Sequence, residues 1–130
     1  MSGGPARAVF GELDERLGIE FVKVTAEKAV ATMPIAGNRQ ITGSMHGGAY
    51  SALAETLASL AACEHAGADR IAYGLDLSIT HTGQATAGRV TATCSAIHLG
   101  RGIAVHEVII EDEEGNRVST ARVTNVLRGK

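Results

Sequence analysis

The segment from His46 to Cys63 constrains the fold of this chain more than any other. It reads His-Gly-Gly-Ala-Tyr-Ser-Ala-Leu-Ala-Glu-Thr-Leu-Ala-Ser-Leu-Ala-Ala-Cys, and the only charged side chain between Gly47 and Cys63 is Glu55. Apolar residues recur at the i, i+3, i+4, i+7 spacing of a helix, and most other positions are alanine. We therefore expect a helix from Gly47 to about His65 that is enclosed on nearly all sides. A lone carboxylate there either faces water or serves chemistry, because burial without a partner costs free energy.

Segments rich in Val, Ile and Thr flank this helix and are typical of strands. The sequence predicts a short helix, two strands, the long helix and four more strands, at 8–17, 19–25, 28–35, 47–65, 71–80, 89–97, 103–111 and 117–127. Turn residues at 112–116 predict a hairpin between the last two strands. This order indicates an α+β fold, with a largely antiparallel sheet against one central helix, in a single domain covering 1–130.

The composition argues against several classes of protein. A net charge of -2, without a basic cluster interleaved with aromatics, predicts neither a nucleic-acid partner nor an anionic membrane. No apolar run is long enough to span a bilayer and the first residues lack a signal peptide's apolar core, so we expect a cytoplasmic protein. Cys63 and Cys94 stand alone, which favours reduced thiols. No His and carboxylate set has metal-ligand spacing, so we expect no metal.

The glycine pair at the predicted helix start indicates a site for a carbonyl oxygen. Amides of a first helical turn lack partners, the macrodipole makes that end partly positive, and glycine allows close approach. The N–H groups of Gly47 and Gly48 can thus stabilise charge developing on a carbonyl. Glu55 is a candidate nucleophile or general base for hydrolysing an activated acyl group. It lies roughly 10–12 Å further along the axis, too far for one carbonyl to reach both. We therefore predict a site shared between two copies of the chain.

Three more polar residues are candidates for assisting this chemistry, and each has a simpler interpretation. Ser59 lies one turn after Glu55 on the same helix face, while Gln40 and His46 precede the helix on a loop. The stripe of Ser51, Glu55 and Ser59 is also typical of a solvated helix face. His46 fits equally well as a hydrogen-bonding residue of the helix start. The nucleophile elbow of serine hydrolases and glycine-rich phosphate loops are both absent from the sequence.

The combination of Gln40, His46–Gly48, Glu55 and Ser59 resembles the hotdog-fold acyl-CoA thioesterases. It is most similar to the branch with a glutamate on the central helix, which includes the 4-hydroxybenzoyl-CoA, aryl-CoA and phenylacetate-pathway (PaaI-like) thioesterases. In that branch the acid follows the histidine of His-Gly-Gly by nine residues and the loop glutamine by fifteen, as it does here. The resemblance covers about residues 17–127.

The resemblance implies a curved sheet wrapped around the helix, and dimers that join their sheets and often form homotetramers. It implies that the Gly47 N–H polarises the thioester carbonyl, and that Glu55 of the facing subunit attacks it or activates water. The remaining implied positions are Gln40 and His46 near the carbonyl, Ser59 near the acid, Gly48 at the helix start and His81 in the acyl pocket. Coenzyme A enters as part of the substrate, and no other cofactor is implied.

One departure from the family follows the strand that ends near His81. The family often carries Arg-Pro there, and this arginine helps to hold the CoA phosphates, whereas this chain continues as Thr-Gly-Gln-Ala. We expect Arg101 or Arg128 to take that role, unless the acyl carrier is not CoA. The expected function is hydrolysis of an acyl-CoA with an aromatic or medium-sized acyl group. An acyl-carrier-protein thioesterase and a non-catalytic, acyl-CoA-binding regulatory homodimer stay open as alternatives.

Overall fold

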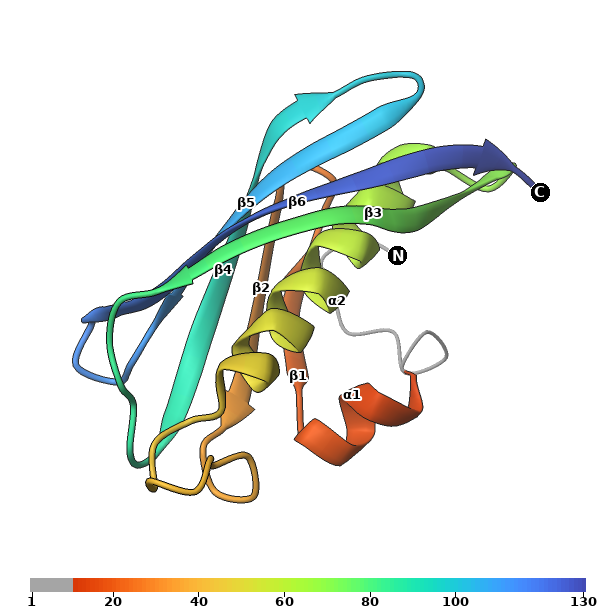
Figure 1. The fold of residues 1–130 in the computed structure, drawn as a ribbon. Helices are drawn as coiled ribbons and strands as arrows, with labels where there is room; N and C mark the ends of the chain where they lie inside the picture. The colour runs from red at the N-terminus through yellow and green to blue at the C-terminus, as the bar shows by residue number, and fades with distance from the viewer. Residues whose placement is uncertain (1–10) are drawn as a thin grey trace.

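A curved antiparallel sheet wraps around one long helix in the structure, a computed structural model that describes residues 11–130 (Figure 1). The elements are α1 (Glu12–Leu17), β1 (Glu20–Val24), β2 (Lys28–Pro34), α2 (Gly47–Ala66), β3 (Arg70–His81), β4 (Arg89–Leu99), β5 (Ile103–Glu111) and β6 (Arg117–Gly129). The strand order is β1-β2-β4-β5-β6-β3, and every neighbouring pair is antiparallel. The predicted hotdog architecture is confirmed. The predicted start of the first helix, residues 8–10, lies outside the described residues.

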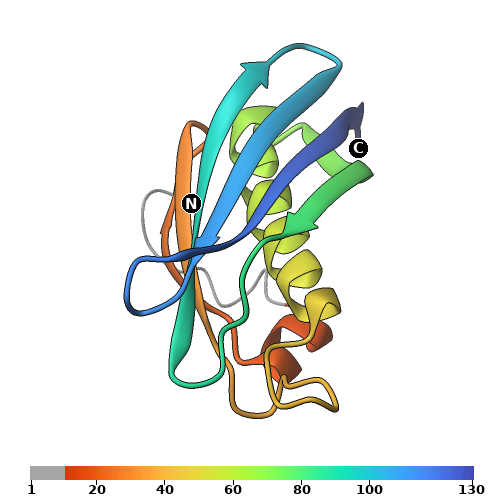
Figure 2. The same cartoon turned by 60° about the vertical axis from the view of Figure 1, so that its left-hand side comes forward.

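The helix α2 is enclosed because its buried face is made of leucines and alanines. Leu53, Ala54, Leu57 and Ala61 are fully buried, and the small alanines let the helix lie close to the sheet. Figure 2 shows α2 in the concave face of the sheet, with α1 beside its first turns. The helix ends at Gly67, whose φ of 83° lies in the left-handed region that favours glycine.

The strand β3 forms one edge of the sheet, so one side of its backbone has no partner among residues 11–130. Leu77 and Ile79 pack against the core, whereas Tyr73 and Leu75 are 53% and 65% exposed. A bulge interrupts its pairing with β6 just after Gly74. The neighbouring strand β6 alternates more regularly, and its buried side chains on the α2 side are Ser119, Ala121, Val123, Asn125 and Leu127.

The hairpin between β5 and β6 has the turn that the sequence predicts. The Asp112 carboxylate accepts hydrogen bonds from the N–H groups of Glu114 and Asn116, and Gly115 has a φ of 83°. These bonds, with the Asn116 backbone first, lower the pKa of Asp112. Among residues 11–130, no helix is long and apolar enough to cross a bilayer.

Candidate active site

The first turn of α2 leaves a single amide without a hydrogen-bond partner in the part of the chain that the structure describes. His46 is the N-cap, and its Nδ1 accepts the Gly48 N–H at 2.7 Å. The His46 carbonyl accepts the N–H groups of Ala49 and Tyr50. The Gly47 N–H therefore stays free at the positive end of the helix dipole, where it can bind an oxygen that gains negative charge.

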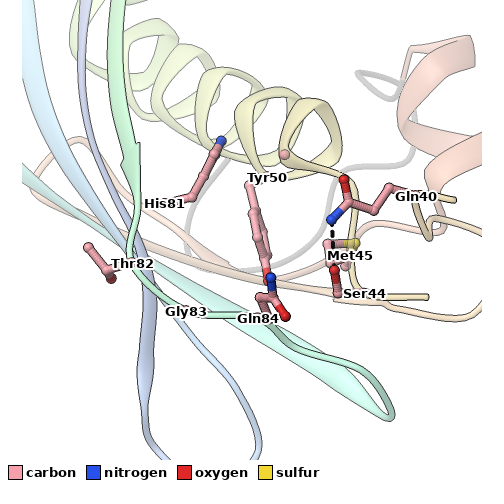
Figure 3. Close-up of a pocket in the computed structure, with 9 residues that line it drawn as sticks. Gln40, Ser44, Met45, Tyr50, His81, Thr82, Gly83 and Gln84 are labelled. Atoms are coloured by element: carbon pink, nitrogen blue, oxygen red, sulfur yellow. Dashed lines mark hydrogen bonds between the residues drawn. The ribbon is translucent and has the colours of Figure 1, made fainter. Parts of the chain in front are cut away.

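Gly47 lies in a hollow of about 390 Å³ at the start of α2, which we call the helix-start hollow (Figure 3). Its lining residues are Gln40, Ser44, Met45, Gly47, Tyr50, His81, Thr82, Gly83 and Gln84. The Gln40 side-chain amide donates to the Ser44 hydroxyl at 2.8 Å, which fixes the amide beside the hollow. The structure thus brings together three predicted site residues, Gln40, Gly47 and His81.

The His81 ring lies directly beside Gly47. A Cβ added at Gly47 would lie 2.7 Å from His81 Nε2, so only glycine fits there without moving the ring. The His81 Nδ1 is 2.8 Å from the Ser119 hydroxyl, which in turn donates to the Thr80 carbonyl at 3.3 Å. The hydrogen bond between Ser119 and Nδ1 fixes the ring plane and leaves Nε2 facing the helix start.

Tyr50 forms the floor of the helix-start hollow. Its ring centroid lies 5.4 Å from that of His81, at an interplanar angle of 41°. The hydroxyl is buried and has no partner of hydrogen-bond geometry. Burial raises the pKa of Tyr50, and the nearby Ala85 backbone offsets part of that rise. The phenol therefore stays protonated at neutral pH, with a donor available at the floor of the hollow.

Glu55 lies in a second hollow, of about 340 Å³, between α1 and α2. This glutamate hollow is lined by Gly11, Leu13, Asp14, Ala52, Glu55, Thr56, Ser59 and Leu60. The carboxylate of Glu55 also reaches the edge strand, since a Cβ added at Gly74 would lie 2.7 Å from Glu55 Oε2. The side chain is exposed in the single chain. Ser59 lines the same hollow, as its spacing from Glu55 predicts.

A buried carboxylate on α1 closes one side of the glutamate hollow. Asp14 is only 8% exposed and accepts hydrogen bonds from the Thr56 hydroxyl at 2.8 Å and from the Gly11 N–H at 3.1 Å. These bonds hold α1 against α2 next to Glu55. Asp14 is not among the predicted site residues, because an acid in a helical first turn is too common a pattern to identify it.

The other predicted site residues lie elsewhere. His46 and Gly48 line a third hollow of about 350 Å³ beside Leu13 and Leu17, separate from Gln40. Arg101 and Arg128 are exposed near the far end of α2. Arg70 links the end of α2 to the turn between β4 and β5, because its guanidinium donates to the carbonyls of Ala66 and Arg101.

The helix-start hollow and the glutamate hollow share no lining residue within one chain. Gly47 and Glu55 are separated by about 12 Å along the helix, at 1.5 Å per residue. A single copy therefore holds the free helix-start amide and the Glu55 carboxylate in two separate places.

Metal ligation and thiol chemistry have little support among the described residues. Within residues 11–130, no group of three His, Cys, Asp or Glu side chains could hold a metal ion. Cys63 and Cys94 are both unpaired, as predicted. Burial raises the pKa of the Cys94 thiol to about 12, so it is not a thiolate at neutral pH.

The fold and the helix-start amide define an enzyme of the hotdog class. Residues 42–119 match the family model of the thioesterase superfamily. The proofreading thioesterase EntH of Cronobacter turicensis is 37% identical over 92% of this chain and 88% of its own length. The 1,4-dihydroxy-2-naphthoyl-CoA hydrolase of Listeria monocytogenes is 37% identical over 91% of this chain and 97% of its own length. The structure of a thioesterase from Haemophilus influenzae superposes with a TM-score of 0.90 at 30% identity, covering 99% of this chain and 96% of that chain. The chain belongs to the thioesterase superfamily, and the predicted enzyme class is confirmed.

Proposed function

We propose that this thioesterase hydrolyses an acyl-CoA at a site built from two copies of the chain, with Gly47 of one copy and Glu55 of the other. The observation that carries this proposal is the separation of the two hollows, each of which holds half of the required groups. In a homodimer where the helix-start hollow of one copy faces the glutamate hollow of the other, each site has both halves.

The free edge of β3 is the surface that supports such a dimer. It belongs to a strand of twelve residues, and exposed edges of that length readily pair with another strand. Tyr73 and Leu75 leave apolar surface uncovered at the same edge. Pairing of two β3 strands would satisfy the unpaired backbone groups and continue the sheet across both copies.

The contacts along β3 support one register for the proposed pairing of two β3 strands. Glu55 touches this strand at Gly74 and Gly47 touches it at His81, seven residues further on. In an antiparallel pair with its two-fold axis near Ser78, Gly74 of one copy lies opposite the His81 end of the other. Strands in a sheet are about 4.8 Å apart. Glu55 would therefore approach Gly47 of the second copy much more closely than Gly47 of its own helix.

The roles follow from the chemistry of thioester hydrolysis. The free Gly47 N–H, with Gly48 shaping the helix start, stabilises the oxyanion that forms at the carbonyl. Glu55 either takes a proton from a water whose oxygen attacks the carbonyl carbon, or attacks that carbon itself to give an anhydride that water hydrolyses. Both routes release CoA as a thiol. Trapping of an acyl group on Glu55 during turnover distinguishes the second route.

The assisting residues are Gln40 near the carbonyl, His46 as the cap that holds the helix start, Ser59 near the Glu55 carboxylate and His81 against the acyl group. Arg101 and Arg128 are proposed to hold the CoA phosphates. They lie beyond Ala66, which is about 16 Å from Glu55 along the helix, a span suited to an extended pantetheine arm. The mechanism uses no cofactor other than the CoA of the substrate.

The acyl group is proposed to be aromatic or medium-sized. The name of the Listeria relative refers to a naphthoyl-CoA, and hollows of 340–390 Å³ suit a group of that size. A screen of CoA release from aliphatic and aromatic thioesters tests this. A preference for short acyl chains such as acetyl would contradict it.

Hydrolysis of carrier-bound acyl groups is the second candidate, favoured by the absence from this chain of the Arg-Pro that the family often carries after the strand ending near His81. Comparing the kcat/KM of one acyl group on CoA and on an acyl carrier protein separates the two candidates. A preference for CoA supports the first.

Glu55→Gln is the main test of the mechanism. We expect kcat to fall about 10²- to 10⁴-fold, because the amide can neither attack nor accept the proton. Glu107→Gln, at an exposed position of β5, is the matched control and should be fully active. Retained turnover in Glu55→Gln would remove this residue from the reaction.

A homotetramer is proposed through the outer face of the sheet. Tyr73 and Ile103 are 53% and 39% exposed, and both pair with Val126 on β6, so the three side chains form one apolar row. Light scattering of the protein and of an Ile103→Lys variant, compared at equal concentration, tests this assembly, because Ile103 lies in the apolar row but not on the β3 edge.

A further inference from the structure

A buried asparagine beneath α2 has no partner for its side chain. Asn125 on β6 is fully buried, and neither its Oδ1 nor its Nδ2 has a hydrogen bond within the described structure. An unpaired amide in the core is costly, so its presence calls for a physical reason. The other buried residues on this face of β6, such as Val123 and Leu127, are mostly apolar.

The position of Asn125 in the sheet places it next to Glu55. Its direct partner on β3 is Gly74, the residue over which the Glu55 carboxylate lies. Opposite residues of an antiparallel pair have their Cβ positions about 5 Å apart and project to the same face. Figure 1 shows β3 and β6 side by side next to α2. Because Gly74 has no side chain, nothing at that position separates the carboxylate from the amide.

A second buried polar atom without a partner lies on the same face of the sheet. His106 on β5 is fully buried, and its Nε2 lies 2.8 Å from the Ala26 carbonyl. A carbonyl accepts, so Nε2 carries the proton and Nδ1, which has no partner, is an acceptor. Burial lowers the pKa of His106 and keeps it neutral. Asn125 pairs with Ala104, two residues from His106 on the same face. A water that donates to His106 Nδ1 and Asn125 Oδ1 would satisfy both acceptors.

We propose that Asn125 is a positioning residue for Glu55, with its Nδ2–H donating to the carboxylate or to the water that the carboxylate activates. A water of that kind would hold Oδ1 from the β5 side and would leave Nδ2 to face the β3 side, where Glu55 lies. The bond to the amide keeps the carboxylate charged and aimed at the substrate carbonyl. This inference rests on the proposed role of Glu55 in hydrolysis.

Few titratable groups face Glu55 within the described chain. Asp14 lines the same hollow from α1, where Thr56 and Gly11 already hold its carboxylate. His106 lies on the far side of Asn125, and His81 lies seven residues along β3 from Gly74. The loss of a donor at position 125 should therefore appear in the pH dependence of kcat/KM, because the carboxylate loses a stabilising hydrogen bond.

Asn125→Ala and Asn125→Ser test the inference, because they differ by one hydroxyl that can replace the donor. In full-length enzyme, we expect Asn125→Ala to move the acid limb of the kcat/KM pH profile upward by about one unit and to lower kcat about tenfold, with KM little changed. Asn125→Ser should restore at least half of the shift. Should the alanine variant fail to fold, Asn125→Leu fills the volume without a donor and gives the same comparison.

Val123→Ala is the control for a purely structural role, since it makes a cavity on the same face of the same strand. It should lower the Tm and leave the acid limb in place. An acid limb that stays unmoved in Asn125→Ala, with a Tm loss like that of Val123→Ala, would overturn the inference. Such a result, combined with an inactive Glu55→Gln, would leave the proposed function standing. An active Glu55→Gln would instead remove the proposed mechanism.

Discussion

The helix-start hollow and the glutamate hollow differ in what they hold and in what they lack. The first has a free backbone N–H and a polar lining that includes Gln40 and His81, with no acidic side chain. The second has two carboxylates, Glu55 and Asp14, and apolar walls from Leu13 and Leu60. One hollow can stabilise an oxyanion, and the other can activate a nucleophile and accommodate an apolar acyl group.

This difference indicates why a thioesterase of this shape would work as a dimer. A rigid helix fixes the amide and the acid about 12 Å apart, and no side-chain rotation closes that gap. A two-fold axis at the edge strand would bring the unlike hollows of two copies together and create two equal sites.

Leu75→Lys should separate the hollows by breaking the dimer. A charged side chain at the exposed β3 edge disfavours strand pairing, so we expect a monomer and a loss of kcat/KM of about 10²- to 10³-fold. Size-exclusion chromatography and CoA release measure both effects. Val22→Lys, on the opposite edge strand β1 and similarly exposed at 57%, should stay dimeric and active. A fully active Leu75→Lys monomer would contradict the shared site.

Gly74→Ala should disturb the glutamate hollow while the dimer stays intact. The new Cβ would lie 2.7 Å from Glu55 Oε2 and would push the carboxylate away. We expect kcat to fall about tenfold at nearly unchanged KM, because the acid is displaced and the substrate is still bound. Gly102→Ala is the matched control, since its added Cβ meets nothing within 4 Å. Equal kinetics for the two variants would mean that the position of Glu55 on β3 is irrelevant.

His46→Ala should affect the helix-start hollow through stability. The ring caps α2 by accepting the Gly48 N–H, and loss of an N-cap costs about 1 kcal/mol. Chemical denaturation should show this loss together with a several-fold lower kcat, because the Gly47 amide is less well oriented. The variant His46→Asn should recover both the stability and the kcat, because asparagine is a strong N-cap residue. A stable but inactive His46→Asn would assign the imidazole a direct role in the reaction.

Asp112→Asn should have the smallest effect, since this turn is remote from Glu55. The pKa of Asp112 is lower in the folded state than in the unfolded chain, where it is near 3.9. The charged carboxylate therefore stabilises the fold above the unfolded pKa. This contribution disappears as the pH falls through the pKa of the folded state. Urea unfolding should show a small deficit for the variant at pH 7 that shrinks below about pH 4. Activity at pH 7 should be unchanged. A deficit that persists at low pH would have a cause other than the charge.

The sequence predicts the elements well because each depends on local patterns. The alanine-rich helix ends within one residue of its predicted position, and the 112–116 turn is correct, since apolar spacing and turn residues act over short range. Strands β4 and β6 run two residues longer than predicted, because cross-strand pairing extends them beyond their own β-branched residues.

The candidate site is only partly predictable, because its environment comes from distant segments. The sequence identifies Gly47, Glu55 and Gln40 by spacing and resemblance. Gly74 could have been noticed, since a glycine inside a strand often marks a bulge or a close approach. Asn125 could not, because its lack of a partner depends on the pairing of β6 with β3 and β5.

Mixing two inactive variants tests the shared site most directly. Glu55→Gln lacks the acid and Gly47→Val blocks the carbonyl-binding amide, so each homodimer should be inactive. A heterodimer of the two contains one intact site and one doubly damaged site, and random exchange should restore about a quarter of the wild-type activity. Absence of any recovery, in a mixture that is shown to contain heterodimers, would contradict a site built from two copies.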